Sequence, residues 1–396
     1  MNQPLQGKVV IDFTQNVAGP YCTQILGDLG ARVIKIERPY AGDDTRGWFP
    51  PQWNGESTTF LALNRNKESV CLDLHHPESP QIIRKLLERA DIVVQSFRTS
   101  TARKLGLDFA SLRHLYPNLV YVEVSAYGVG GPNENLPGYD AILQAYTGIM
   151  SVNGDPKCDP ARVGVSIIDL ATGMWAAMGA LAVVLDKRTD TSRYVQASLL
   201  ETGVAWMQLL ITNYLAEGSV PAKMGSVAPM AAPYEAFRTH DGWIMIAAGN
   251  NTLFRKLCTA LDSQLDNNAK FASNDLRVMH RSELHEEIQG LLFHEQRTTS
   301  YWVDRLQAVG VPCSPIHSVA EVCRDVQVNS LELIKSSRDF RIPGFQWVDL
   351  PIRIDGQRAD VRHWPPQLSE HTTAVLGWLG YPPDEINRLK QKRVVN

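Results

Sequence analysis

The first 130 residues alternate short apolar runs with segments of helical length, and this alternation restricts the fold more than any other feature of the chain. The runs with the length and composition of strands are 8–13, 32–37, 69–74, 92–97 and 119–124. The helical segments between them are 18–29, 79–90 and 102–115. Strands joined by helices pair in parallel through right-handed crossovers. The sequence therefore predicts the α/β class, with an open, mostly parallel Rossmann-like sheet whose ligands bind beyond the carboxyl ends of the strands.

The turn after the first strand argues against a nicotinamide cofactor. It runs from Thr14 to Pro20 and holds a single glycine, Gly19, where the dinucleotide fingerprint requires three. Pro20 fits the first turn of a helix, because the N–H that proline lacks would have no partner there. We therefore do not expect NAD to bind, although binding of another ligand that contains a nucleotide stays an open alternative.

A single carboxylate, Asp169, stands at the start of an uncharged run without proline that extends to Leu185. The length and composition of this run predict a buried helix, and its alanines and glycines allow another helix to approach closely. Two roles for Asp169 stay open from the residues alone. It is either a helix cap stabilised by the helix dipole, or a nucleophilic carboxylate held ionised in an apolar site.

Composition excludes several classes of protein. The net charge of −3 gives no electrostatic reason to bind nucleic acid or an anionic membrane surface. The apolar run after Asp169 is flanked by charge and built from small residues, so we do not expect it to span a membrane, and the N-terminal residues lack a signal-peptide pattern. The six cysteines form no Cys-x-x-Cys pair, which indicates reduced thiols and a cytoplasmic protein. The histidines show no spacing for a metal site.

The second half of the chain divides into further units. Helices are expected at 140–150 and 199–216, with a strand at 194–198 between them. From residue 225 the pattern changes to a strand–turn–strand with Asp241-Gly242 at its turn, and helical segments follow at 252–261, 282–292 and 299–308. We predict a large α/β domain over residues 1–224, a small α+β domain over 225–325, and a linker with a C-terminal tail over 326–396. The prolines of the tail indicate an extended segment with one helix at 372–379.

Taken in order along nearly the whole chain, several motifs resemble those of class III CoA-transferases, the CaiB/BaiF type. This group includes formyl-CoA:oxalate and succinyl-CoA:dicarboxylate transferases. The matching segments are Val17-Ala18-Gly19-Pro20, Ile34-Lys35-Ile36-Glu37-Arg38-Pro39, Tyr127-Gly128 with Gly131-Pro132, Gly138-Tyr139-Asp140, Asp169-Leu170-Ala171-Thr172-Gly173 and Glu370-His371-Thr372. No single segment is specific; the resemblance lies in their order and spacing.

The resemblance implies that Asp169 is the covalent nucleophile of an acyl-CoA:carboxylate CoA-transferase. Such an enzyme forms an aspartyl–acyl anhydride and then an aspartyl–CoA thioester, with CoA as a substrate and no permanently bound cofactor or metal. Each step passes through an oxyanion, which backbone N–H groups stabilise. The candidates are in the glycine-rich loop, at Gly128, Gly130 and Gly131, or in the small domain, at Gly249 and Asn250.

The same resemblance places CoA across the first sheet. The positions that match CoA or substrate contacts are Asn16, Val17, Arg38, Leu72, Phe97, Lys104, Tyr139 and Asp140. The permanent charge and planar fork of Arg38 suit a phosphate group, although an exposed surface arginine is the alternative. Lys104 stands where relatives often carry arginine. Tyr139 is either a pocket residue near the thioester or a core residue.

Departures from the family pattern bear on the substrate. Relatives commonly have Asn-Phe-Arg-Pro-Gly where this chain has Ser96-Phe97-Arg98-Thr99-Ser100, so a CoA contact by Ser96 is not expected. The extra glycines that formyl-CoA:oxalate enzymes carry ahead of the segment matching 244–248 are absent, which disfavours oxalate as the acceptor. The region 234–251 resembles relatives that use succinyl-CoA and dicarboxylates such as glutarate.

Two other functions remain as alternatives. The α-methylacyl-CoA racemases are similar over the N-terminal half, but they carry a histidine before the aspartate where this chain has Tyr139-Asp140, and tyrosine is a poor acid–base group near neutral pH. A non-catalytic acyl-CoA-binding protein is the other alternative, and the intact Asp169 speaks against it. The resemblance also implies a homodimer of two interlocked chains.

Overall fold

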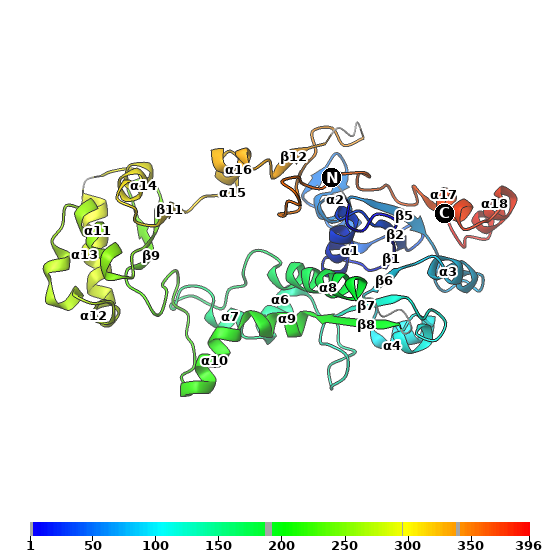
Figure 1. Ribbon diagram of the computed structural model, residues 1–396, viewed down its shortest axis with the longest axis horizontal. Coiled ribbons are helices and arrows are strands. Elements are labelled where there is room, and N and C mark those ends of the chain that lie inside the picture. Colours follow the sequence, from blue (N-terminus) through cyan, green and yellow to red (C-terminus); the bar gives the residue numbers. More distant parts are fainter. Residues whose placement is uncertain (1–2, 187–191, 295, 338–340) are drawn as a thin grey trace. The chain divides into compact units, whose positions relative to one another are not determined.

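The computed structural model describes residues 3–186, 192–294, 296–337 and 341–396 (Figure 1). It comprises two compact units. The first unit combines Met1–Ile149, Val163–Ala216 and Leu331–Asn396, and the second combines Met150–Arg162 and Glu217–Ser330. Each unit is described by itself below.

A six-stranded parallel sheet forms the centre of the first unit. Its strands are β1 (Val9–Phe13), β2 (Arg32–Glu37), β5 (Lys67–Cys71), β6 (Ile92–Gln95), β7 (Val120–Ser125) and β8 (Arg193–Ser198). Their spatial order is β5-β2-β1-β6-β7-β8, so the direction of winding reverses between β1 and β6. This confirms the predicted parallel α/β sheet. In such sheets ligands bind where the winding reverses, beyond the carboxyl ends of the two strands.

The helices between successive strands of this sheet are α1 (Ala18–Asp28), α2 (Thr58–Leu63), α3 (Ser79–Leu87), α4 (Thr99–Leu105), α5 (Phe109–Leu112), α6 (Asp140–Tyr146), α7 (Ile149–Val152) and α8 (Ile167–Leu185). Most of α7 belongs to the second unit. In the first unit, α9 (Leu199–Trp206) and α10 (Gln208–Glu217) follow the last strand, β8. The same unit holds the short elements η1 (Asp44–Gly47), β3 (Gln52–Trp53), β4 (Glu56–Ser57), β12 (Ile334–Ser336) and β13 (Gln346–Val348).

Three of the helices expected as single segments are interrupted. The one expected at 102–115 is divided into α4 and α5, because Gly106 takes a left-handed conformation (φ +65°) that ends α4 and Asp108 then caps α5. Likewise, Gly148 (φ +87°) lies between α6 and α7. The helix expected at 199–216 is divided at Met207 into α9 and α10. The prediction of uninterrupted helices was wrong at these points.

Helix α8 packs against α1, β7 and β8. A Cβ atom on Gly173 would lie 2.5 Å from the Ala18 carbonyl oxygen, so only glycine permits this approach of α1 and α8. The close packing predicted from the small residues is therefore confirmed. The predicted buried helix is a core helix, although two of its side chains, Trp175 and Met178, remain 47% and 53% exposed. Although α8 is long and apolar enough to cross a membrane, its packing identifies it as a core helix.

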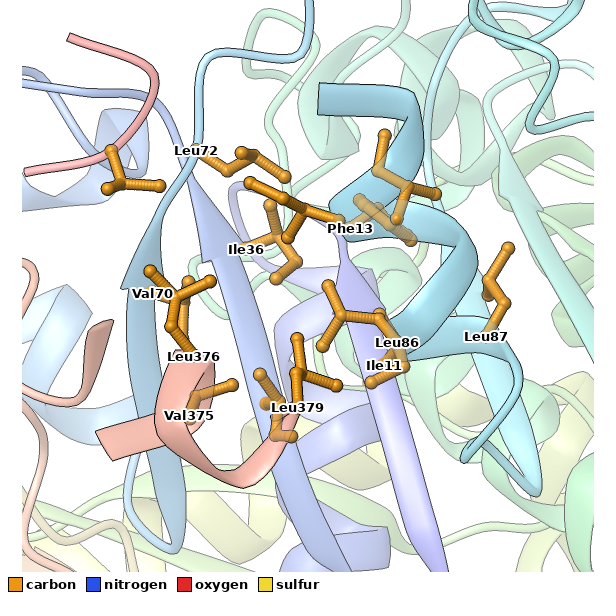
Figure 2. Close-up of a cluster of buried hydrophobic side chains, with 14 of the residues drawn as sticks. Ile11, Phe13, Ile36, Val70, Leu72, Leu86, Leu87, Val375, Leu376 and Leu379 are labelled. Carbon is orange, nitrogen blue, oxygen red and sulfur yellow. The ribbon is translucent and has the colours of Figure 1, made fainter. Parts of the chain in front are cut away.

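The C-terminal segment completes the core on one side of this sheet. Helix α17 (Thr372–Trp378) places Val375 and Leu376 against Val70 of β5, next to leucines of α3 (Figure 2). Ser69, on the edge strand β5, donates its N–H to His371 Nδ1 (3.2 Å) and accepts the His371 N–H at its carbonyl (2.9 Å). The segment thus covers a sheet edge that would otherwise offer unpaired backbone groups.

The tail contains a second helix that was not predicted, α18 (Pro383–Gln391). Its sequence satisfies the rules for a helix, because Pro383 stands in the first turn, acidic Asp384 and Glu385 follow, and basic Arg388 and Lys390 stand in the last turn. The prolines of the tail predict an extended chain, whereas Pro382-Pro383 marks the start of a helix.

The second unit contains a three-stranded antiparallel sheet of β9 (Tyr234–Arg238), β10 (Trp243–Ala247) and β11 (Cys313–Pro315). The hairpin expected around Asp241-Gly242 is confirmed as β9 and β10. The helical elements are α11 (Asn251–Ala260), η2 (Leu265–Asn267), η3 (Ala269–Phe271), α12 (Asn274–Met279), α13 (Arg281–His294), α14 (Thr299–Ala308), α15 (Val319–Val322) and α16 (Val326–Ser330). The buried Arg277 side chain joins three segments of this unit, because it donates hydrogen bonds to the carbonyls of Ala232, Phe271 and Gly249.

Candidate active site

Two cavities open at the point where the winding of the parallel sheet reverses. The first, of about 220 Å³, is lined by the turn after β1, the loop after β6, and Tyr139 and Asp169. The second, of about 470 Å³, lies beyond the carboxyl ends of β1, β2 and β5 and includes Arg38 and Leu72. Gln15 and Phe97 border both cavities, so the two are adjacent. This is where an open parallel sheet is expected to bind a ligand.

A buried network of charges holds the turn after β1. Asp12 accepts hydrogen bonds from the Thr14 N–H (2.8 Å) and the Thr23 hydroxyl (2.6 Å), and it lies 3.3 Å from Lys67 Nζ. Lys35 donates to the Thr14 carbonyl (2.8 Å). Burial alone would raise the pKa of Asp12, but the adjacent lysines outweigh burial and lower it. The turn is therefore fixed by charged groups that stay ionised inside the core.

Asn16 has a left-handed backbone conformation (φ +68°) within this turn. Its N–H donates to Asp43 Oδ1 at 3.2 Å, and the other oxygen of Asp43 lies 2.8 Å from buried Lys35. The conformation of Asn16, and with it the wall of the first cavity, is therefore supported from the interior of the protein. A non-glycine residue keeps such a conformation where its surroundings stabilise it.

Asp169 lies in the first turn of α8 and borders the first cavity. Asp140 Oδ2 accepts the backbone N–H groups of Ile168 (2.9 Å) and Asp169 (3.2 Å). The carboxylate that caps α8 is therefore Asp140, and the capping role considered for Asp169 is not supported. Gln144 donates to the other oxygen of Asp140 and keeps it in place. In the described part of the chain, no hydrogen bond reaches the Asp169 carboxylate.

Burial raises the pKa of Asp169 to about 7, and the negative charge of Asp140 contributes in the same direction. An aspartate that is poorly solvated gains less from its ionised form than one in water, so its carboxylate is more basic and a stronger nucleophile. Asp169 thus presents, at the wall of the first cavity, a carboxyl group with a raised pKa and with no hydrogen-bond partner in the described part of the chain.

The other candidate residues take different places. Asn16, Val17, Phe97 and Tyr139 line the first cavity with Asp169, and Arg38, Leu72 and Phe97 line the second. Lys104 is exposed on α4 and lines neither cavity, although its helix neighbours Thr101 and Leu105 line the second.

The glycines considered as oxyanion donors lie outside both linings. The Gly128 N–H donates to Ser125 Oγ (3.2 Å) and the Gly130 N–H to Glu134 Oε2 (2.9 Å), while Gly131 has φ +82°. In the second unit, the Gly249 carbonyl accepts from Arg277 and the Asn250 side chain caps α11.

Several lining residues were not foreseen from the sequence. Gln15 and Arg98 adjoin predicted contacts, so their position in the loops was a usable signal. Trp48 and Arg393 come from segments that only the fold brings to the cavities. Among the described residues, no group of three or more His, Cys, Asp or Glu side chains is arranged to hold a metal ion.

Comparison with known proteins points to one family. The model of the family described as CoA-transferase family III matches residues 5–372. A succinyl-CoA:glutarate CoA-transferase of Homo sapiens is 35% identical over 376 residues, covering 94% of this chain and 85% of the human protein. A succinate–glutarate CoA-transferase of Agrobacterium fabrum is 34% identical over 392 residues, covering 95% and 96%. The crystal structure of a CAIB/BAIF family protein from Brucella suis superposes with a TM-score of 0.86 at 32% identity, covering 96% of this chain and all of that one (100%).

Proposed function

The chain belongs to CoA-transferase family III, and from this premise we propose that it moves CoA from succinyl-CoA to a dicarboxylic acid, with Asp169 as the nucleophile. The observation that carries the proposal is the state of the Asp169 carboxylate. Its pKa is raised, and it has no hydrogen-bond partner among the described residues. It lines the cavity at the point where the winding of the sheet reverses. The adjacent second cavity offers room for the nucleotide end of CoA.

The reaction proceeds by exchange at carbonyl carbons. Asp169 attacks the thioester carbonyl of the donor, the C–S bond breaks, and CoA leaves as the thiolate. The thiolate attacks the Asp169 carbonyl of the resulting anhydride and releases the donor acid, which leaves CoA on Asp169 as a thioester. The acceptor carboxylate attacks this thioester to give a second anhydride and the thiolate. Attack of the thiolate on the acceptor's acyl carbonyl then forms the new acyl-CoA and restores Asp169.

Asp140 and the helix it caps orient the nucleophile. Because Asp140 accepts the N–H groups of Ile168 and Asp169, it holds the first turn of α8 in one conformation. The Asp169 carboxyl group therefore keeps its position both when it attacks the donor and when it is attacked in later steps. We assign the contact with the acyl group to Tyr139, which lines the cavity and is 57% exposed. The donors of the oxyanion site are proposed among the backbone N–H groups of the first unit near Asp169.

A dicarboxylate acceptor has a cation to pair with in the first cavity, although Glu134 also lines it. An anionic acid must approach the carboxylate of Asp169, and a positive side chain reduces the repulsion between them. Of the described residues that line this cavity, Arg98 is the cation. We assign to it the second carboxylate of the acceptor, in keeping with the glutarate named for the human and Agrobacterium relatives.

We also propose that the active protein is a cytosolic homodimer. The faces of α8, α9 and α10 expose large apolar side chains, including Trp175 (47%), Trp206 (52%) and Leu209 (76%). Exposed apolar surface of this kind is typical of a subunit interface. The cysteines, all of them free, suit a reducing compartment. Light scattering of the purified chain at micromolar concentration tests the assembly, and a monomer would contradict it.

The covalent intermediate provides the test of the function. The intact mass is measured after mixing with succinyl-CoA, for the wild type, Asp169→Ala and Asp169→Asn, with peptide mapping of the adduct. We expect a CoA adduct on Asp169 that hydroxylamine removes and that both variants lack. Absence of an adduct with every acyl-CoA tried, together with exchange of the α-proton of a branched acyl-CoA, would instead identify the racemase of the same fold.

A further inference from the structure

The second cavity contains one residue from the opposite end of the chain, Arg393. The segment after α18 is held there by its backbone. The Val394 N–H donates to the Leu389 carbonyl (3.0 Å), the Asp73 N–H donates to the Val394 carbonyl (2.9 Å), and Val395 forms an antiparallel bridge with Leu72. Arg393 itself has a left-handed conformation (φ +59°) that turns the chain from the helix towards β5. Its position at the end of β5 is therefore fixed by the fold.

The neighbouring cations of this segment are all engaged. Arg388 and Lys392 pair with Glu78 at 2.7 and 2.6 Å, and Lys390 donates to the Thr373 hydroxyl at 2.8 Å. Within the ranges that the structure describes, the Arg393 side chain has neither an ion pair nor a hydrogen bond. The cation without a partner is thus the one that faces the cavity.

The other walls of this cavity suit a phosphorylated nucleoside. Phe13, Ile36 and Leu72, which belong to the core cluster in Figure 2, provide an apolar floor, and Tyr40 and Phe97 offer aromatic faces for a base. Arg38 provides one guanidinium, but it already donates to the Gly42 carbonyl at 3.1 Å and pairs with Asp44. A second guanidinium is needed to match a dianionic phosphate together with a pyrophosphate.

The two cavities fix which end of CoA lies near Arg393. The thioester must reach Asp169 in the first cavity, and the pantetheine arm then extends past Gln15 and Phe97, which border both cavities. The nucleotide with its phosphates is at the far end of the molecule and falls in the second cavity. We propose that Arg393 binds a phosphate group of this nucleotide end, so that the C-terminal segment forms part of the CoA site. This inference rests on the proposed CoA-transferase function.

The test compares Arg393→Gln, which keeps most of the side-chain stem, with Arg393→Lys, which keeps the charge, and with the adjacent control Lys392→Gln. The dissociation constant of CoA is measured by titration calorimetry. The KM is measured for succinyl-CoA, for its 3′-dephospho analogue and for succinyl-pantetheine, which has no nucleotide. We expect Arg393→Gln to weaken CoA binding and raise the KM of succinyl-CoA roughly 3- to 10-fold, with kcat retained, Arg393→Lys to recover part of the loss, and Lys392→Gln to bind as the wild type does.

The substrates separate the possible outcomes. Loss of the effect with the dephospho analogue assigns Arg393 to the 3′-phosphate, and an effect that persists there but disappears with succinyl-pantetheine assigns it to the pyrophosphate. Unchanged CoA binding in Arg393→Gln, or an equal effect on succinyl-pantetheine, would overturn the inference while leaving the transferase intact. Wild-type protein that binds CoA without forming an adduct would instead overturn the proposed function alone, and wild-type protein that does not bind CoA would overturn both.

Discussion

At the scale of single residues, two neighbouring carboxylates differ in their surroundings: Asp140 caps α8, and Asp169 lines the first cavity. Asp140 is buried and hydrogen-bonded to the start of α8, whereas Asp169 is partly buried, faces the cavity and has its pKa raised to about 7. Burial contributes the larger part of this shift and the charge of Asp140 the smaller. The pair therefore predicts how rate and stability depend on pH.

The first prediction concerns the pH dependence of adduct formation. Because the proposed reaction uses the ionised form of Asp169, the rate of acylation by succinyl-CoA should rise with pH and level off above about 7. Asp140→Asn keeps an oxygen that accepts the N–H groups of α8 but removes the charge, so the rising limb should move to lower pH. Rapid-quench measurements between pH 5 and 9 check this. A rising limb at the same pH in the variant and the wild type would show that Asp140 has no electrostatic effect on Asp169.

The second prediction concerns stability. A carboxyl group whose pKa is higher in the folded state favours folding while it is protonated, and this contribution is lost as the pH rises from the unfolded value of 3.8 to about 7. Asp169→Asn cannot ionise, so it should unfold at the same denaturant concentration as the wild type near pH 4 and be more stable at pH 8. After allowance for partial solvent exposure, we expect a difference of about 1–2 kcal/mol. If Asp169→Asn and the wild type were equally stable at pH 4 and also at pH 8, the pKa of Asp169 would not be raised.

At the scale of secondary-structure elements, the contact between α1 and α8 positions Asp169. Gly173 stands one helical turn after Asp169, and its missing side chain allows the backbone of α1 to approach within van der Waals distance. The same α1 begins directly after the turn that lines the first cavity. Packing between these helices therefore sets the distance between that turn and Asp169.

The third prediction follows from this contact. Gly173→Ala would place a Cβ atom 2.5 Å from the Ala18 carbonyl oxygen, so the helices must separate. We expect a loss of about 1–3 kcal/mol in the free energy of unfolding, together with slower acylation of Asp169. Gly377→Ala in α17 is the matched control, because no atom lies within 4 Å of its Cβ position. It should leave stability unchanged or raise it by about 0.5 kcal/mol. Denaturant unfolding of both variants decides the matter.

At the scale of the whole molecule, residues from the two ends of the chain share one core. Leu376 and Val375 of α17 pack with Val70 of β5 and Leu86 of α3 (Figure 2), and the following segment reaches the second cavity. The C-terminal segment is thus a structural part of the first unit and provides a wall of its site. Damage to this segment is expected to affect both stability and CoA binding.

The fourth prediction tests the contribution of this segment to the core. Leu376 is fully buried at 0% exposure, so Leu376→Ala should destabilise the protein by about 2–5 kcal/mol. Leu115→Ala, at a position that is 68% exposed in the same unit, should cost less than about 0.5 kcal/mol. The two midpoints of chemical unfolding are compared. Similar effects of the two substitutions would show that α17 contributes little to the stability of the first unit.

The strands of the parallel sheet could be predicted from the sequence, because buried parallel strands are continuous apolar runs separated by helices of the right length, whereas the strand order and the reversal of winding came from the structure. The sequence also indicated Asp169, Tyr139 and the turn at Asn16, which line one cavity, since they lie in local motifs whose order resembles a known family. Helix interruptions at Gly106 and Met207 and the helix α18 were missed. These depend on the conformation of one or two residues, which apolar periodicity does not register.

What the sequence determined by itself was thus the parallel sheet and the family of the chain, because periodicity and motif order are local properties. Tertiary structure alone decided that Asp140 caps α8, that burial raises the pKa of Asp169, and that Arg393 reaches the cavity beside Arg38. Arg38 and Arg393 are separated by most of the chain, and the pairing of the tail with β5 brings them to one cavity. The burial of Asp169 and the walls of the cavities are formed by residues that are distant in the sequence. Both therefore exist only once the chain has folded.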